Sequence, residues 1–203
     1  MQGNIKASNN SQSISIKMKT LSLLLAATTI VSGATFAAQT LYKDYPADVM
    51  PELSESGEFP VGVTTMEVTY PEAAMTMEGE METRALTLEV WYPAQKATQN
   101  TLYSDETRSG QVFEIQAEAS RDVAIAESES KFPIVVVSHG YTGYRTLMYY
   151  LGEHLASHGY VVAAIDHTDS TNKDVNFAEN PYSGFPSTLL NRSRDQVFTL
   201  NAV

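Results

Sequence analysis

The chain has 203 residues and no cysteine, and 24 acidic residues against 13 basic ones give it a formal net charge of −11. This acidity argues against a nucleic-acid partner, because phosphate backbones repel a negatively charged surface. The lack of cysteine excludes a thiol nucleophile, a zinc ribbon and a disulfide scaffold. Hydrophobic residues make up 43% of the chain, which suits the packed core of one domain or most of a larger one.

The N-terminus carries the pattern of a secretory signal peptide over residues 1–37. Lys17 and Lys19 precede an apolar run over residues 21–31, and small residues follow it up to the expected cleavage position. The apolar run is shorter than the ~20 residues of a membrane-spanning helix, so we expect export to the periplasm or the medium and no stable membrane anchor. The polar residues before Met18 predict that Met18 is the working start.

An acidic linker with several prolines follows over residues 38–60. Acidic residues continue to Glu82, and such a run can attract calcium or a basic partner. No Asp-x-Asp-x-Asp-Gly loop is present in the sequence, so we interpret the run as a solvated face.

Two strands are predicted next. Residues 61–70 are rich in β-branched side chains, and residues 85–92 alternate between two faces. The two segments are predicted to pair as an antiparallel hairpin around residues 78–80. Residues 94–131 are polar, and we expect a long surface connection there, with one short helix over residues 114–126 and no chemistry.

A βαβ unit begins at the apolar run of residues 134–137, which is typical of a strand buried on both faces. Residues 145–158 have the spacing of an amphipathic helix, and Gly159 is placed to end it. Residues 161–165 form a second apolar run. A strand, a helix and a strand in this order predict a parallel pair with a right-handed crossover.

Residues 187–203 predict a last helix, with Leu190, Val197 and Leu200 close to one face. The helical pattern still continues where the sequence ends, so we expect these residues to be the N-terminal portion of a larger domain. The predicted fold over residues 61–203 is α/β, with an antiparallel β-hairpin leading into a parallel βαβ sheet.

Two loops follow the buried strands, over residues 138–143 and 166–169. Ligands of α/β sheets bind outside the carboxyl ends of the strands, so these loops are the candidate site. The first loop has two glycines, which expose backbone N–H groups to an anion. Neither a Gly-x-Gly-x-x-Gly nor a Walker pattern is present, so we interpret the loop as an oxyanion site for acyl transfer.

Four segments carry a resemblance to a known family. They are Phe-Pro-Ile-Val-Val-Val-Ser-His-Gly-Tyr-Thr-Gly at 132–143, Leu-Ala-Ser-His-Gly-Tyr-Val-Val-Ala-Ala-Ile-Asp-His at 155–167, Glu-Val-Trp-Tyr-Pro at 89–93 and Arg-Asp-Gln at 194–196. The sequence resembles the first half of an α/β-hydrolase, and is similar to dienelactone hydrolase-like proteins, platelet-activating-factor acetylhydrolases and secreted polyester hydrolases. The resemblance implies hydrolysis of a small or polymeric carboxylic ester, such as a lipid, lactone or polyester, without a cofactor or metal.

The resemblance also implies roles for single residues. Tyr141 would donate its backbone N–H to the oxyanion, and its ring would line the acyl pocket. His139, Gly140, Thr142 and Gly143 would form the rest of the binding loop, with His139 shaping that loop rather than acting as a general base.

The family places its nucleophile in a Gly-x-Ser-x-Gly elbow, and no such elbow occurs in residues 1–203. Ser138, Ser157 and Ser183 lack the flanking glycines. We therefore expect the nucleophilic Ser and the Asp and His of the triad beyond Val203, and no activity from this chain alone. The alternative is a non-catalytic secreted module that binds a small anionic or acyl ligand at the strand-end pocket. The sequence leaves the oligomeric state open.

A metal site is a further alternative, because His139, Asp166, His167 and Asp169 all lie at strand ends. Hydrogen bonds between loops explain their polarity equally well, and the resemblance favours a metal-free mechanism.

Other polar residues receive structural interpretations. His154 and His158 lie four apart without the glutamate of a zinc protease, so we place them on the helix surface. We interpret Arg192, Arg194 and Asp195 as either a solvated face or a structural ion pair.

Overall fold

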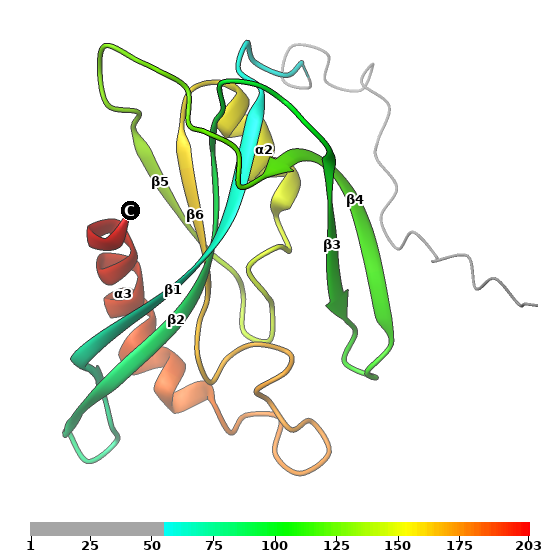
Figure 1. Cartoon of the computed structure of the whole chain (residues 1–203). Helices are drawn as coiled ribbons and strands as arrows, with labels where there is room; N and C mark the ends of the chain where they lie inside the picture. Colours follow the sequence, from blue (N-terminus) through cyan, green and yellow to red (C-terminus); the bar gives the residue numbers. More distant parts are fainter. Residues whose placement is uncertain (1–54) are drawn as a thin grey trace, which may run out of the picture. The chain divides into compact units, whose positions relative to one another are not determined.

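The computed structural model describes residues 55–203, so the predicted signal peptide, the start at Met18 and most of the acidic linker lie outside the described residues. A six-stranded mixed sheet has the order β3-β4-β1-β2-β6-β5 (Figure 1). Within the described range, no helix combines the length and hydropathy needed to cross a bilayer. The elements are β1 (Val61–Met75), β2 (Met81–Pro93), β3 (Asn100–Glu106), β4 (Val112–Arg121), β5 (Ile134–Ser138), α2 (Tyr149–Ser157), β6 (Val161–Asp166) and α3 (Phe185–Ala202).

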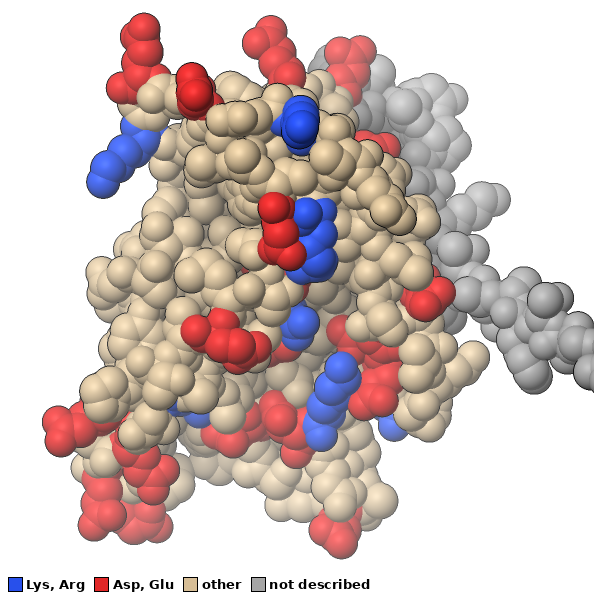
Figure 2. Space-filling view, in the orientation of Figure 1, with Lys and Arg blue, Asp and Glu red and all other residues tan. Residues whose placement is uncertain are grey.

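β1 and β2 form the predicted antiparallel hairpin, paired from Val61↔Pro93 to Met75↔Met81 with a shift of register between Tyr70 and Ala74. The turn of this hairpin includes the predicted residues 78–80. It is closed by a hydrogen bond from Thr76 N–H to the carbonyl of Glu80, and Gly79 adopts a φ of 84°. Both strands extend beyond their predicted ends. Figure 2 shows acidic side chains gathered around the tip of this ribbon, as expected of a solvated face. The glutamates exposed there are Glu72, Glu78, Glu80 and Glu82.

The two faces of β2 are both buried. Leu86, Leu88 and Val90 belong to a core cluster with residues of β6, while Trp91 on the opposite face joins a second cluster. α2 lies directly on that second face, because a Cβ built at Gly152 would come within 2.5 Å of the Trp91 ring. Glycine at this position therefore sets how closely the helix approaches the sheet.

The predicted surface connection over residues 94–131 is wrong. β3 and β4 form an antiparallel hairpin there, and no helix occupies residues 114–126. Strands form here because the buried residues recur with a period of two, so that alternate side chains point into the core. Those buried residues are Thr101, Tyr103, Asp105, Phe113, Ile115, Ala117 and Ala119. β4 pairs with β1 at only two positions, and Figure 1 shows the hairpin diverging from the sheet beyond them.

The βαβ unit has the predicted arrangement, with β5 and β6 parallel from Ile134↔Val161 to Ser138↔Ile165. α2 starts later than predicted, because the residues before Tyr149 form successive turns. Gly159 has a φ of 92° and follows the end of the helix, as predicted. The residues of β5 are half-buried rather than fully buried, because β5 is an edge strand of the described sheet.

α3 faces the sheet with polar residues, contrary to the prediction of an apolar face. Leu190 is half-buried, and Val197 and Leu200 are exposed. Asn191 explains the difference, since its side-chain amide exchanges two hydrogen bonds with the backbone of Met75 at the end of β1. The other buried polar groups of the helix differ in their partners. Asp195 pairs with Arg84 of β2, Thr188 Oγ1 donates to the carbonyl of Gly184, and Thr199 Oγ1 has no hydrogen-bond partner among the described residues. The buried positions are Thr188, Asn191, Asp195 and Thr199.

Candidate active site

The two loops predicted to form the site lie against one another at the carboxyl ends of β5 and β6. Thr142 N–H donates to the carbonyl of Ser170 at 2.7 Å, and Gly143 forms a parallel bridge with Thr171. The backbone N–H of His167 donates to Nε2 of His139 at 3.3 Å. The parallel pairing of β5 with β6 is what brings these loops to the same edge of the sheet.

The first loop contains a tight turn closed by a 2.9 Å hydrogen bond from Gly143 N–H to the carbonyl of Gly140. Thr142 has a φ of 67°, the left-handed value that a type II turn requires at its third residue. A side chain at Gly143 would meet the His139 Cβ at 2.9 Å, so glycine is needed for this close approach. The turn is thus held in a conformation that a free peptide of this sequence would disfavour.

The direction of the Tyr141 N–H follows from this turn. The Gly140 carbonyl accepts hydrogen bonds from Gly143 N–H and from Nδ1 of His139, the latter at 2.6 Å. In a trans peptide the C=O and the following N–H point in opposite directions, so the Tyr141 N–H points away from both donors. It donates to no other group among the described residues, and a Cβ built at Gly140 would meet nothing within 4 Å.

His139 is buried and its tautomer is fixed. Its Nε2 accepts from the His167 backbone, so the proton lies on Nδ1, which donates to Gly140. Burial lowers the pKa of His139 to about 4, although the bond to Gly140 opposes this change. A neutral imidazole with both nitrogens occupied shapes the loop and is not free to act as a general base.

Tyr141 itself turns its side chain toward α3. Its ring meets Phe185 edge to face, with the centroids 5.4 Å apart, and its buried hydroxyl has no hydrogen-bond partner among the described residues. The role of this ring in an acyl pocket stays a prediction.

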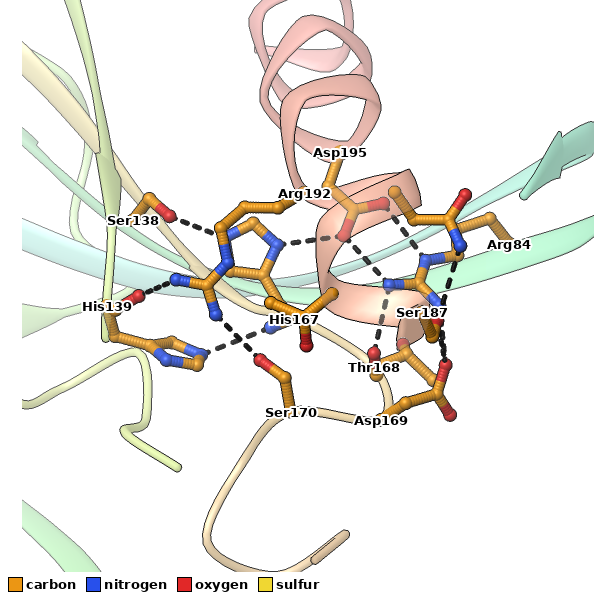
Figure 3. A network of polar contacts seen from close by, with 12 residues as sticks. Arg84, Ser138, His139, His167, Thr168, Asp169, Ser170, Ser187, Arg192 and Asp195 are labelled. Carbon is orange, nitrogen blue, oxygen red and sulfur yellow. Dashed lines mark hydrogen bonds and ion pairs between the residues drawn. The ribbon is translucent and has the colours of Figure 1, made fainter. Parts of the chain in front are cut away.

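A Ser–His–Asp chain of hydrogen bonds lies beside the loop (Figure 3). Ser138 Oγ is 2.8 Å from Nε2 of His167, and Nδ1 of His167 is 2.8 Å from Oδ2 of Asp195. Burial lowers the pKa of His167 against the opposing effect of Asp195, so the ring is neutral at pH 7. Its Nδ1–H then donates to Asp195, and its Nε2 accepts from the Ser138 hydroxyl.

The carboxylate of Asp195 is shared with Arg84, whose Nε and Nη2 donate to its two oxygens at 3.0 and 2.9 Å. Burial alone would raise the pKa of Asp195, but the hydrogen bonds from His167 and Arg84 outweigh it and lower that pKa. Asp195 is a fully buried residue of α3, so the solvated face is wrong at this residue. It forms a structural ion pair, but its partner is Arg84 and not Arg192 or Arg194. Because Arg84 compensates the negative charge of the Asp195 carboxylate, that carboxylate does less to strengthen His167 as a base.

A second network holds the far end of the loop. The backbone N–H and Nη1 of Arg145 each donate to Asp166 at 2.5 Å, and its Nε donates to Glu89 at 3.0 Å. Arg121 reaches the same Glu89 at 2.6 Å from β4. The segment after Gly143 is thereby fastened to both β2 and β6.

The residues proposed as an alternative metal site are all used in these contacts. Asp166 pairs with Arg145, His167 with Asp195, and Asp169 with Arg84 and Ser187. Among residues 55–203, no group of three His, Asp or Glu side chains is arranged to hold a metal ion. His154 and His158 pack ring against ring on α2, away from these loops.

Arg84 and Arg108 were not identified from the sequence, and Arg192 was interpreted there only as part of a solvated face or a structural ion pair. Arg84 lies within the predicted hairpin, and Arg192 donates to the carbonyl of His139 and, at 2.7 Å, to Ser170 Oγ. Arg108, from the turn between β3 and β4, donates to Thr142 Oγ1 at 2.8 Å. No short motif connects these positions to the loop, because they are brought together by pairings between distant segments.

A hollow of about 900 Å³ opens at the opposite ends of the strands, lined by residues that include Phe132, Ile134, Val161 and Leu200. Ile134 and Val161 begin β5 and β6, so this hollow lies at the amino ends of the strands. It is therefore separate from the strand-end loops and shares no lining residue with them.

Comparison with known proteins gives one family match and several short alignments. The sequence profile described as "Platelet-activating factor acetylhydrolase, isoform II" matches residues 49–185, more than half of the chain. Curated platelet-activating factor acetylhydrolases from Canis lupus familiaris and Bos taurus are 49% and 44% identical over 41 residues, which is 20% of this chain and 9% of each relative. The matched chain thus spans only a small part of these relatives.

A solved ferulic acid esterase from Streptomyces cinnamoneus is also similar, with 24% sequence identity and a TM-score of 0.44. That alignment covers 56% of this chain and 35% of the esterase.

Proposed function

This chain belongs to the platelet-activating factor acetylhydrolase isoform II family, and on that premise we propose that it forms part of a serine-dependent carboxylic ester hydrolase. The family membership agrees with the α/β-hydrolase resemblance of the sequence. In the proposed enzyme, these residues supply the oxyanion-binding loop after β5. The nucleophilic Ser and the Asp and His that activate it lie outside residues 1–203.

The proposed reaction has two acyl-transfer steps. The Ser hydroxyl attacks the ester carbonyl as its proton passes to the catalytic His, and the carbonyl oxygen becomes negative. The Tyr141 N–H and the N–H after the nucleophile then stabilise this oxygen. The His proton leaves with the alcohol, and water attacks the acyl-enzyme by the same route to release the acid and the free Ser.

The observation that supports this proposal is the orientation of the Gly140–Tyr141 peptide. Its carbonyl is held by His139 and Gly143, while its N–H is directed away and is without a partner among the described residues. A preorganised donor of this kind need not reorganise when charge develops, which is the main source of oxyanion stabilisation. The open space beside Gly140 leaves room for a reacting carbonyl.

The Ser138–His167–Asp195 chain is the competing source of a nucleophile within these residues. Its hydrogen bonds have the order of a catalytic relay, but Asp195 is paired with Arg84 and fully buried within α3. We therefore propose that these three hydrogen-bonded side chains hold α3 against β6, and that the nucleophile lies elsewhere.

We test the proposal with Tyr141→Pro in the full-length protein, which removes the N–H. Because one oxyanion donor is lost, kcat for a short-chain nitrophenyl ester should fall by about 10²- to 10³-fold. Tyr141→Ala removes the ring that packs on Phe185 but retains the N–H, so a loss shared by both variants would belong to the side chain instead. Thermal melts of each variant check that the fold is intact.

The isolated 203-residue chain should not turn over the same ester. Turnover by that chain which disappears on Tyr141→Pro and on Ser138→Ala would contradict the proposal, because the nucleophile would then be Ser138.

A further inference from the structure

Arg108 occupies the turn that joins β3 to β4, which is tied to the candidate site at several points. Asn172 Nδ2 donates to the carbonyl of Glu106 at 2.5 Å, and Lys173 Nζ lies 3.4 Å from Asp105. The turn is itself closed by a 2.9 Å bond from Thr107 N–H to the carbonyl of Gln111. The loops after β5 and β6 and the hairpin tip therefore form one connected surface.

The guanidinium of Arg108 is held in a defined position on this surface. Its Nη2 donates to Thr142 Oγ1 at 2.8 Å, and its Cζ lies 4.6 Å from the centroid of the Phe177 ring. Thr142 directly follows Tyr141, so this cation lies beside the proposed oxyanion donor. Its Nε and Nη1 have no hydrogen-bond partner in the described part of the chain, and the side chain is exposed.

Arg108 differs from the other cations close to the site in having neither a carboxylate partner nor several neutral acceptors among the described residues. Arg192 also has no ion pair in that part of the chain, but its guanidinium donates to the carbonyl of His139 and to Ser170 Oγ. Arg84, Arg145 and Lys173 each pair with an aspartate, whereas no ion pair includes Arg108 within residues 55–203. The chain as a whole has nearly two acidic residues for each basic one, and Figure 2 shows basic side chains scattered among the acidic ones. An arginine left unpaired in such a chain, with two donor nitrogens free, is suited to bind an anionic oxygen group.

We propose that Arg108 binds an anionic group of the ester substrate, a carboxylate or a phosphate, and so sets the enzyme's preference for anionic esters. This inference rests on the proposed function. Arg108 remains anchored to Thr142 through Nη2 while Nε and Nη1 donate to the anion, which positions the ester carbonyl near the Tyr141 N–H. The stacking on Phe177 holds the guanidinium plane and reduces the conformational freedom lost on binding.

The test uses the full-length protein and three acetate esters of similar size, with acetate release as the readout. The neutral ester is 2-methoxyethyl acetate, the carboxylate is 3-acetoxypropionate, and the phosphate is 2-acetoxyethyl phosphate. Arg108→Gln should raise KM roughly five- to tenfold for at least one anionic ester, with kcat and the neutral ester unchanged. The anionic ester with the larger change identifies the group that Arg108 recognises.

Two further variants separate binding from structure. Arg108→Lys keeps the charge and should restore part of the lost affinity, while Lys96→Gln removes an exposed positive charge outside this surface and should change nothing. Equal losses on the neutral and anionic esters, or no change in KM for either anion, would overturn the assignment of Arg108. If the wild-type protein hydrolyses none of the three esters, the proposed function itself fails.

Discussion

Two ionic networks lie on opposite faces of β2 and differ in their access to water. On the α3 face, Asp195 is fully buried and binds Arg84, whose side chain is only 4% exposed. On the other face, the equally buried Glu89 binds Arg121 and Arg145, whose side chains are 36% and 27% exposed. A buried charge that loses its partner cannot regain hydration, while a half-exposed one can. The comparison predicts that similar substitutions on the two faces will have unequal costs.

The largest effect is expected from Asp195→Asn. This change removes the buried carboxylate partner of Arg84 and leaves it only the half-exposed Asp169, so it should lower the free energy of unfolding by about 3–5 kcal/mol. Urea denaturation of the full-length protein measures this value. Asp169→Asn is the matched control, because Asp169 binds the same Arg84 but is 48% exposed, and it should cost about 1 kcal/mol or less. Equal costs would show that burial does not distinguish the two carboxylates.

The second effect is a loss of stability in acid that originates at the loops after β5 and β6. The folded pKa of His139 is about 4, below the ordinary value of ~6.5, so between these pH values the unfolded chain binds more protons than the folded one. Stability is therefore complete above pH ~6.5 and decreases as the pH falls toward 4, by up to about 3 kcal/mol for this residue. His167 shifts in the same direction.

Melting temperatures measured from pH 7.5 to pH 4.5 check this prediction. His139→Asn should reduce the pH dependence and leave the part due to His167, whereas the same change at the exposed His158 should leave the slope as it was. A slope that is undiminished in His139→Asn would locate the acid-sensitive group elsewhere.

The smallest effect is expected on the opposite face. Glu89→Gln deprives Arg121 and Arg145 of one partner, but both guanidinium groups reach water, and Arg145 keeps Asp166. The loss in unfolding free energy should be about 1–2 kcal/mol by urea denaturation. Glu67→Gln, an exposed position on the neighbouring strand, should cost less than about 0.5 kcal/mol. If Glu89→Gln cost as much as Asp195→Asn, solvent access to the arginines would not explain the contrast.

The sequence was most informative where structure is local. The β1–β2 hairpin, the β5–α2–β6 unit and the Gly159 helix end each depend on residues close together in the chain. The β3–β4 hairpin was missed because its buried positions include threonine, aspartate and alanine, which weaken the apolar alternation. Phe113 and Ile115 are two residues apart, and Ala117 and Ala119 continue this spacing. That alternation was the signal in the sequence for a strand.

The site was only partly predictable for a related reason. The loop of residues 138–143 could be found because it follows a buried strand, and the meeting of the two loops follows from the parallel pairing. The partners of that loop could not be found, because Arg108 and Arg192 reach it from a distant hairpin and from α3. The polar face of α3 was missed since helix periodicity identifies apolar stripes and gives no weight to matched buried polar groups.

The contacts of α3 also bear on the order in which the molecule folds. Arg84 is 111 residues from Asp195, Met75 is 116 from Asn191, and the Tyr70 hydroxyl donates to a carbonyl 128 residues away. Closing such long loops carries a large entropic cost, so these contacts form after the local hairpins and the βαβ unit. During synthesis, Arg84 and His167 leave the ribosome well before their shared carboxylate does. Until then, the strand-end loops lack the support of α3, which follows both of them in the chain.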